Sequence, residues 1–452
     1  MASAAEQMAA NLSWGALAKA TDLRQRIFFT IGVLIIYRLG TYIPVPGIEG
    51  EALRRTWAEV GQGIGGMLNL FTGGAMSRMG IFALGIMPYI SASIIVQLLG
   101  TMYEPWKNLK KEGELGRKKL NQYTRYGTVL LAVFQAYGIA ASLQAGDLAH
   151  NPGWFFIAGV VITLVGGTMF LMWLGEQITA RGIGNGISLI IFVGIVAEIP
   201  AALMQFLAQG RSGAISTPVI LGVIVMVVVV IAFVVFMERA LRKIHIQYPR
   251  RQVGMKVYDG GSSHLPIKVN PAGVIPAIFA SSILLLPTTI GTFSGNTTNP
   301  VISWIALYLG YGTPLHALAL AIMIVFFSYF YTHNVSFKVD EVAENLKNQN
   351  GFIPGIRPGK KTEDYLTYVT NRVLVLGSAY LAAVCLLPEF LIANVGLPFY
   401  FGGTSVLIVV SVTMDTINQV QSHLLAHQYE SLIEKSQLRG KRKTGPRAPA
   451  RR

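Results

Sequence analysis

The chain has 452 residues, of which 52% are hydrophobic and 13% are charged, and its formal net charge is +15. Charged residues make up about a quarter of an ordinary soluble globular protein, so this composition excludes that class and predicts a polytopic membrane protein. The single cysteine, Cys385, excludes an internal disulfide.

Ten apolar segments are long enough to cross a bilayer, which takes about 20 helical residues. The remaining segments are short polar connections, a few longer loops and a basic tail. In chain order the predicted spans are residues 27–43, 80–100, 127–144, 154–174, 184–206, 217–237, 271–291, 313–333, 373–392 and 400–420.

Lysine and arginine are unevenly divided between the two sides of this topology. The N-terminus, the loops after even-numbered spans and the C-terminal tail share one side, and of the 37 basic residues only Arg38, Arg54, Arg55, Arg78 and Arg211 fall elsewhere. Basic residues gather on the cytoplasmic side of membrane proteins, which predicts that both termini are cytoplasmic. Topology alone explains most of this charge, although anionic lipid, an acidic partner or ribosomal RNA would also be attracted to it.

Four polar or glycine-rich segments lie between or after the spans. Residues 62–74, QGIGGMLNLFTGG, are too short to span and too apolar for a free loop, which favours a re-entrant piece at about 62–79. The cytoplasmic loops 238–270 and 334–372 are long and rich in Arg, Lys, Gly and Pro, which is typical of functional or disordered loops. The tail from Arg439 onward is predicted to be disordered.

Two stretches of the chain are repeated in the predicted second half. GIMPYISAS at 85–93, in span two, agrees with GVIPAIFAS at 273–281, in span seven, in Gly, Pro, Ile, Ala and Ser. GISLIIF at 186–192 opens span five, and GTSVLIV at 403–409 opens span ten. Five spans per half place the halves in opposite orientations, which is the inverted-repeat plan of many transport proteins. We expect halves at 1–206 and 207–425, a basic tail at 426–452, and helices that proline weakens locally.

The predicted spans hold almost no ionisable groups at membrane depth. Arg38, Glu176, Glu198 and Asp415 fall near span ends, where interfacial snorkelling or capping explains them. The duplicated segments instead carry isoleucine at helical spacing. Each isoleucine alone is explained as packing or lipid-facing filler, but their joint placement suggests an apolar collar around a pore, which would close by dewetting.

A secondary transporter and an intramembrane enzyme are the two alternative classes for such a chain. A secondary transporter of a small solute shares inverted repeats, but it needs ionisable or Na⁺-coordinating groups at the midplane. An intramembrane enzyme needs a catalytic set, and the spans carry none; GIRPGKKT lacks the earlier glycine and the following Ser or Thr of a P-loop. His423 and His427 share a helix face without a third ligand nearby. We therefore predict no enzymatic activity, cofactor or metal.

Several motifs, in order, resemble the SecY family of protein-translocation channels. They are GIMPYISASIIVQLL, RGIGNGISLIIF, HLPIKVNPAGVIPAIFASS, GFIPGIRPGKKT and the ending FGGTSVLIVV to QYESL, and the resemblance runs from about Thr21 to Arg439. It implies an all-α fold of ten spans in two pseudo-symmetric halves, with a pore ring, a plug, and a lateral gate between spans two and seven. One departure is Pro271 in KVNPAG, expected to stiffen the start of the gate helix.

The resemblance also implies roles for individual residues. It assigns the pore ring to Ile86, Ile90, Ile187, Ile191, Ile275, Ile278 and Ile408. It assigns the plug to Met67, Leu68, Asn69, Leu70, Phe71, Gly73 and Gly74. It assigns the lateral gate and signal-sequence groove to Pro88, Ser91, Ala92, Pro276, Phe279, Ser281 and Ser282. It assigns motor and ribosome docking to Arg239, Arg242, Lys243, Arg250, Arg251, Arg357 and Lys360.

The implied function is passive conduction of unfolded polypeptide across the bacterial cytoplasmic (inner) membrane, with sideways release of apolar segments into phospholipid. The implied partners are SecE and SecG in a heterotrimer, the SecA ATPase motor, the ribosome, signal peptides and nascent chains. Energy would come from these partners and from the membrane potential.

Overall fold

The computed structural model describes residues 21–53, 64–213, 216–249, 251–253, 256–258, 261–293, 308, 313–395 and 403–441. These residues are mainly helical. The helices of the first part are α3 Thr21–Gly40, α5 Ile64–Phe71, α6 Met87–Met102, α7 Glu104–Lys111, α8 Glu114–Ala145, α9 Trp154–Arg181, α10 Gly186–Arg211 and α11 Thr217–Arg239. Those of the second part are α12 Ile275–Phe293, α14 Pro314–Tyr331, the π-helix η1 Thr332–Ser336, α15 Val339–Asn348, α16 Lys360–Val395 and α17 Gly403–Lys441.

Within the described ranges, six helices are long and apolar enough to cross a membrane: α8, α9, α10, α11, the run from α14 to Asn348, and α16. The helical membrane class is therefore confirmed, while the count of ten spans is met only in part. Helix α6 has 16 residues, which at 1.5 Å per residue rise about 24 Å, less than the roughly 30 Å of a bilayer core. The chain directly before α6, residues 80–86, is non-helical and mostly buried.

The first pair of repeated windows adopts the same local structure twice. Gly85 (φ +56°) and Gly273 (φ +63°) both take the left-handed conformation, and a helix begins two residues after each. Pro88 and Pro276 therefore lie in the first turn of their helices, where a proline removes no helical hydrogen bond. The expectation that these prolines weaken the spans is wrong, because they mark helix starts.

The second pair of windows also shares a structural role. Gly186 and Gly403 are the first residues of α10 and α17. A Cβ at Gly186 would collide with the carbonyl oxygen of Gly175 in α9, and a Cβ at Gly403 with that of Val384 in α16. In both places glycine lets a helix start directly against the backbone of the preceding helix.

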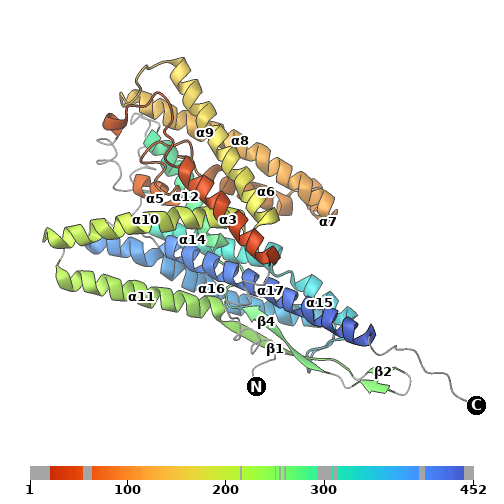
Figure 1. Cartoon of the computed structure of the whole chain (residues 1–452). Coiled ribbons are helices and arrows are strands. Elements are labelled where there is room, and N and C mark those ends of the chain that lie inside the picture. Colours follow the sequence, from red (N-terminus) through yellow and green to blue (C-terminus); the bar gives the residue numbers. More distant parts are fainter. Residues whose placement is uncertain are drawn as a thin grey trace, which may run out of the picture.

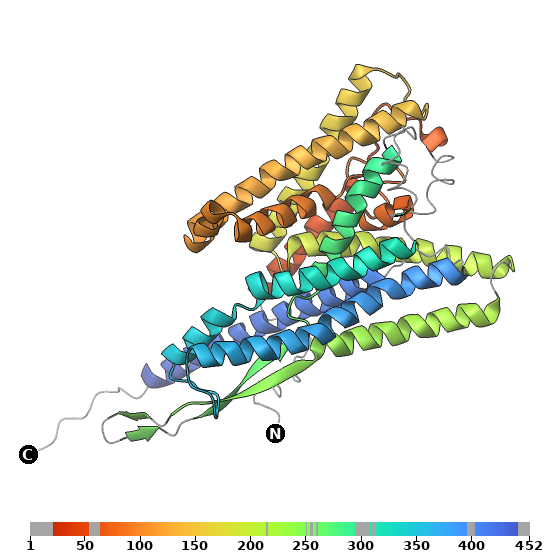
Figure 2. The same cartoon turned by 180° about the vertical axis from the view of Figure 1, so that it is seen from behind.

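The helices form two groups that meet along α12 (Figures 1 and 2). Helices α6, α8 and α9 pack together in one group, and α14, α16 and α17 pack in the other, beside α11. Helix α12 contacts α14 on one side and α6 and α8 on the other, while α10 packs against both α9 and α17. One large apolar core, which includes Leu171, Ile195, Ile324 and Leu381, runs through both groups.

The two segments predicted as cytoplasmic loops contain regular structure. In the first, β1 Leu241–Gln247 pairs antiparallel with β4 Ser262–Lys268, and β2 Arg251–Val253 pairs with β3 Lys256–Tyr258. This ribbon extends beyond the helix ends in Figure 2. The second segment contains α15 and the start of α16, and α17 continues to Lys441. The predicted tail at 426–452 is therefore helical in its first part, and residues 442–452 lie outside the described ones.

Candidate functional site

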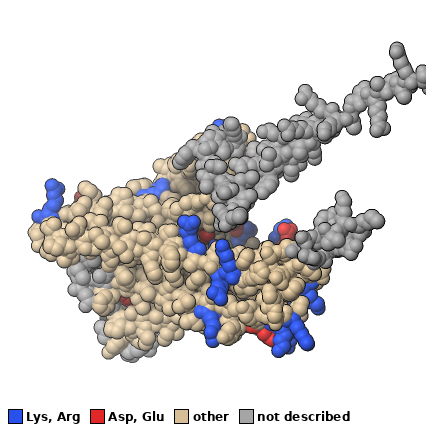
Figure 3. Space-filling view, turned by 90° about the horizontal axis from the view of Figure 1, so that it is seen from below, with Lys and Arg blue, Asp and Glu red and all other residues tan. Residues whose placement is uncertain are grey.

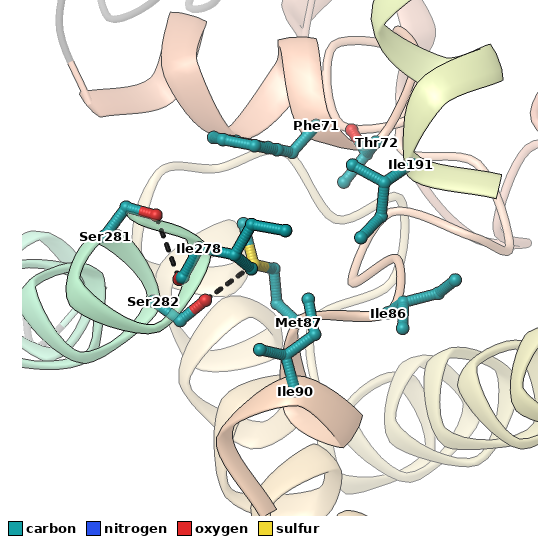
Figure 4. A pocket seen from close by; sticks show the side chains of 9 residues that line it. All are labelled: Phe71, Thr72, Ile86, Met87, Ile90, Ile191, Ile278, Ser281 and Ser282. Atoms are coloured by element: carbon teal, nitrogen blue, oxygen red, sulfur yellow. Dashed lines mark hydrogen bonds between the residues drawn. The ribbon is translucent and has the colours of Figure 1, made fainter. Parts of the chain in front are cut away.

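Two cavities meet between the two helix groups, and isoleucines form the wall between them. The smaller is lined by Phe71, Thr72, Ile86, Met87, Ile90, Ile191, Ile278, Ser281 and Ser282, and their side chains converge in Figure 4. The larger is lined by Tyr89, Ile90, Ser93, Gln97, Asn185, Ile187, Ser188, Ile191, Ile275, Ile278, Phe279 and Tyr331. Ile90, Ile191 and Ile278 line both cavities and therefore separate them.

The cavities differ strongly in size. The larger has a volume of about 210 Å³, enough for several water molecules, whereas the smaller has about 10 Å³. A cavity needs about 10–15 Å³ to hold one water, so the smaller one is closed to a water column. No lining residue of either cavity is charged. The wall is therefore an apolar constriction with a polar, wider space on one side.

The predicted ring residues other than the three that line both cavities take three kinds of position. Ile86 lines the smaller cavity, and Ile187 and Ile275 line the larger. Ile408 lines neither: it is fully buried in the same apolar core. The structure therefore brings six of the seven isoleucines to the cavities and places the seventh behind them.

The predicted plug segment closes the smaller cavity on its far side. Helix α5 ends in a tight turn in which Gly73 N donates to Leu70 O (3.3 Å) and Gly74 N donates to Asn69 O (2.9 Å). Gly73 (φ +65°) is left-handed, as this type of helix end requires. Leu70 and Phe71 are buried. Of the predicted plug residues, the side chains of Met67 and Leu68 lie outside the described ones.

The two repeated windows face each other across the seam between α6 and α12. Ser282 Oγ donates to Met87 Sδ at 3.8 Å, which joins the two helices (Figure 4). Pro88, Ser91, Pro276 and Ser281 are buried nearby. Phe279 packs edge-on against Phe327 and Tyr331 of α14. Ala92 packs against α8, where a Cβ added at Gly127 would lie 3.3 Å from the Ala92 Cβ.

The turn before α12 is fastened to neighbouring elements. Asn270 Nδ2 donates to Gly273 O within the turn (2.9 Å) and to Glu238 Oε1 of α11 (2.9 Å). Pro271 lies in this turn, outside the helix, and its carbonyl accepts a hydrogen bond from Ser336 Oγ. Pro271 therefore lies at the entry to the gate helix, in the turn before its first residue, Ile275.

A second side-chain contact joins the two helix groups, through the elements α7 and η1. Lys110 Nζ of α7 donates to Asn334 O of η1 at 3.3 Å. Burial, together with the charges of Lys338 and Arg117, lowers the pKa of Lys110 below its ordinary value. This hydrogen bond is a candidate contact for holding the two helix groups together.

Two polar arrangements were not predicted as parts of a site. Arg38 and Glu198, interpreted as interfacial residues, both approach the glycines that follow α5. His316 Nδ1 and Glu389 Oε1 form a buried pair at 2.8 Å between α14 and α16. The partners are far apart in sequence, and no motif connects them.

Five of the predicted docking residues lie around a surface that the two loops build together. Gln247 and Phe352 exchange two backbone hydrogen bonds (2.9 and 3.0 Å), and Ile244, Ile267, Val339 and Leu366 share an apolar cluster that fixes the loops together. The exposed basic residues around it are Arg239, Arg242, Lys243, Arg357 and Lys360.

Two further docking residues cannot be placed. Arg250 lies outside the described residues, and Arg251 lies in β2 with its side chain outside them.

On the face drawn in Figure 3, basic side chains are more prominent than acidic ones. Among the described residues, no three His, Cys, Asp or Glu side chains are grouped to hold a metal ion.

Comparison with known proteins identifies the family. A SecY family model matches residues 80–417. The protein translocase subunit SecY of Rickettsia typhi is 50% identical over 425 residues, which cover 93% of this chain and 98% of the relative. A solved structure concerned with how the SecY plug domain stabilises the closed state of the translocation channel has a TM-score of 0.63 and 21% identity, covering 88% of this chain and 92% of that chain.

A further solved structure, Sec61 in the canine ribosome-channel complex from the endoplasmic reticulum, has a TM-score of 0.60 and 20% identity, covering 88% of this chain and 92% of that chain. At these identities the structural matches show the fold, while the family model and the sequence relative show the family. This chain belongs to the SecY family.

Proposed function

We propose that the chain is the channel subunit of a protein translocase, through which unfolded polypeptide crosses the membrane. The observation that carries the proposal is the uncharged isoleucine constriction between an open cavity of about 210 Å³ and a closed one of about 10 Å³. An apolar constriction has no charge to select one solute, and it can close by dewetting when nothing occupies it. A transporter of a small solute is not favoured, since the sequence relative is a translocase subunit.

The ring in this proposal consists of Ile86, Ile90, Ile187, Ile191, Ile275 and Ile278, with Ile408 supporting it from behind. The α5 segment acts as the plug. The seam between α6 and α12 acts as the lateral gate for signal sequences and membrane segments, with Ser91, Phe279, Ser281 and Ser282 beside it. The paired starts of α6 and α12, and of α10 and α17, support two inverted halves of five spans each.

The remaining assignments follow from the same proposal. Both termini and the joined basic loops lie on the cytoplasmic side of a bacterial inner membrane, because the basic residues concentrate on that side. The loop surface around Arg242 and Arg357 docks the SecA motor and the ribosome, and SecE and SecG complete the channel. The chain is not itself an enzyme in this scheme, and its partners supply the energy.

The test is reconstitution of the chain with SecE and SecG in vesicles that enclose a protease-protected space. A preprotein should become protected only when SecA and ATP are added outside. A control variant, Arg357→Glu, should lose this protection while leaving the vesicles sealed. The proposal is wrong if the wild-type complex protects no preprotein while it exchanges a small solute across the membrane.

A further inference from the structure

Helix α3 supplies two hydrogen-bond donors to the backbone that follows α5. Tyr37 Oη donates to Thr72 O at 3.2 Å, and Arg38 Nη1 donates to Gly73 O at 2.7 Å. Within the turn that ends α5, the backbone amides donate hydrogen bonds to carbonyls earlier in the chain. Gly73 O therefore accepts from a donor outside the turn, Arg38. Thr72 O accepts from Tyr37 and also, at 3.4 Å, from Ala75 N.

Close packing fixes the distance between these partners. A Cβ at Gly73 would lie 2.9 Å from Gly194 Cα of α10, so the plug backbone contacts the α10 backbone directly. Tyr37 is only 2% exposed and its ring stacks on Phe82 at 6.1 Å. The hydroxyl is therefore held in place before it bonds, which lowers the entropy cost of the contact.

The positive charge of Arg38 matches the polarity of the helix end. The C-terminal end of a helix carries partial negative charge, and the Arg38 guanidinium lies there. The carboxylate of Glu198 packs so closely against Gly74 that a Cβ added at residue 74 would collide with it. Arg38 and Arg78 both lie over the ring of Tyr42, at 5.5 and 4.4 Å from its centroid.

We infer that Tyr37 and Arg38 are positioning residues that hold the plug in its closed seat; we call this pair the α3 latch. The inference rests on the proposed function and adds residues to it, since neither side chain lines either cavity. A passing polypeptide need not touch them. Losing the latch should therefore favour the displaced plug without damaging the constriction itself.

The test compares Tyr37→Phe, Arg38→Gln and the double variant, in the complex with SecE and SecG, with a control, Arg24→Gln. Arg24 is an exposed residue at the other end of α3. The first measurement is hydrogen exchange of the amides of residues 72–78, and the second is the open fraction in planar bilayers without a signal peptide. A charge-assisted bond is strong enough to shift a two-state equilibrium by about 10-fold, so both should rise by about that factor or more in the double variant.

Two comparisons separate the latch from general damage. Arg38→Lys keeps the charge and should show a smaller rise than Arg38→Gln. If Arg38→Gln fails to fold, judged by faster exchange throughout α9, Tyr37→Phe decides alone, because it removes only a hydroxyl. Exchange and open fraction equal to those of Arg24→Gln would overturn the latch.

Failure of the latch and failure of the proposed function have different signatures. Export of a preprotein with an intact signal sequence is measured in parallel on the wild-type complex. If the wild type exports and the latch variants behave like the control, only the latch is wrong. If the wild type does not export, the proposed function is wrong, and hydrogen exchange still decides whether Tyr37 and Arg38 hold the turn.

Discussion

The isoleucine constriction gives the sharpest prediction. Ile86, Ile191 and Ile278 are 5%, 6% and 8% exposed, and all three line a cavity of about 10 Å³. Replacing all three with alanine removes every side-chain carbon beyond Cβ. A buried Ile-to-Ala change costs about 2–5 kcal/mol when the cavity stays dry, so three dry voids would cost about 6–15 kcal/mol.

Filling the voids with water costs less free energy than leaving them dry. The neighbouring cavity of about 210 Å³ is already large enough for water, and the enlarged space would connect with it. We therefore expect the triple alanine variant to conduct ions in planar bilayers without a signal peptide, while the wild-type complex stays closed. Alanine is preferred to glycine because glycine at Ile191 and Ile278 would also destabilise α10 and α12 by about 1 kcal/mol each.

A matched control changes the same residue type on the outer surface. Ile35, Ile162 and Ile322 are 55%, 72% and 60% exposed, so their replacement by alanine leaves the constriction intact. This control should be as tight as the wild type. If the constriction variant is also as tight as the control, the isoleucines do not form the seal and the reasoning fails.

Two further predictions concern the seam and the packing behind it. In a cysteine-free background, Met87→Cys with Ser282→Cys should be joined by a short bifunctional thiol reagent, and the joined complex should not export, because the native side chains are in contact across the seam at 3.8 Å; unimpeded export with the link formed would refute the gate. Glu389→Ala should lower the melting temperature, since removing one partner of the buried hydrogen bond with His316 costs about 1–3 kcal/mol, whereas Glu341→Ala, in an exposed pair, should have little effect; equal melting temperatures would contradict the role of the buried pair.

The repeated windows show what sequence can predict. Hydropathy predicts the helical membrane class, and the recurrence of glycine and proline reflects the same local structure at the starts of α6 and α12. The effect of the prolines was mispredicted, because a proline in the first turn and one in the middle of a helix look alike in sequence until the helix start is known. The left-handed conformation of Gly85 and Gly273, two residues before each helix, shows that both prolines lie in a first helical turn.

Long-range polar contacts could not be predicted from sequence. Arg38 and Gly73 are separated by 35 positions, and the bond depends on the close approach of α10 at Gly194. The β1–β4 ribbon was also missed, because alternating residues in LRKIHIQ bury only Ile244 and Ile246, against α15 and α16 partners distant in sequence. Such pairings depend on tertiary packing.

The most direct test of the central claim locates a polypeptide during its passage. A preprotein with one cysteine is halted in the reconstituted complex so that this cysteine lies at mid-membrane depth. The account predicts a disulfide with Ile278→Cys and none with Val228→Cys, which lies on the outer surface of α11 and is 61% exposed. A halted polypeptide that links to Val228→Cys and not to Ile278→Cys would contradict passage through the isoleucine constriction.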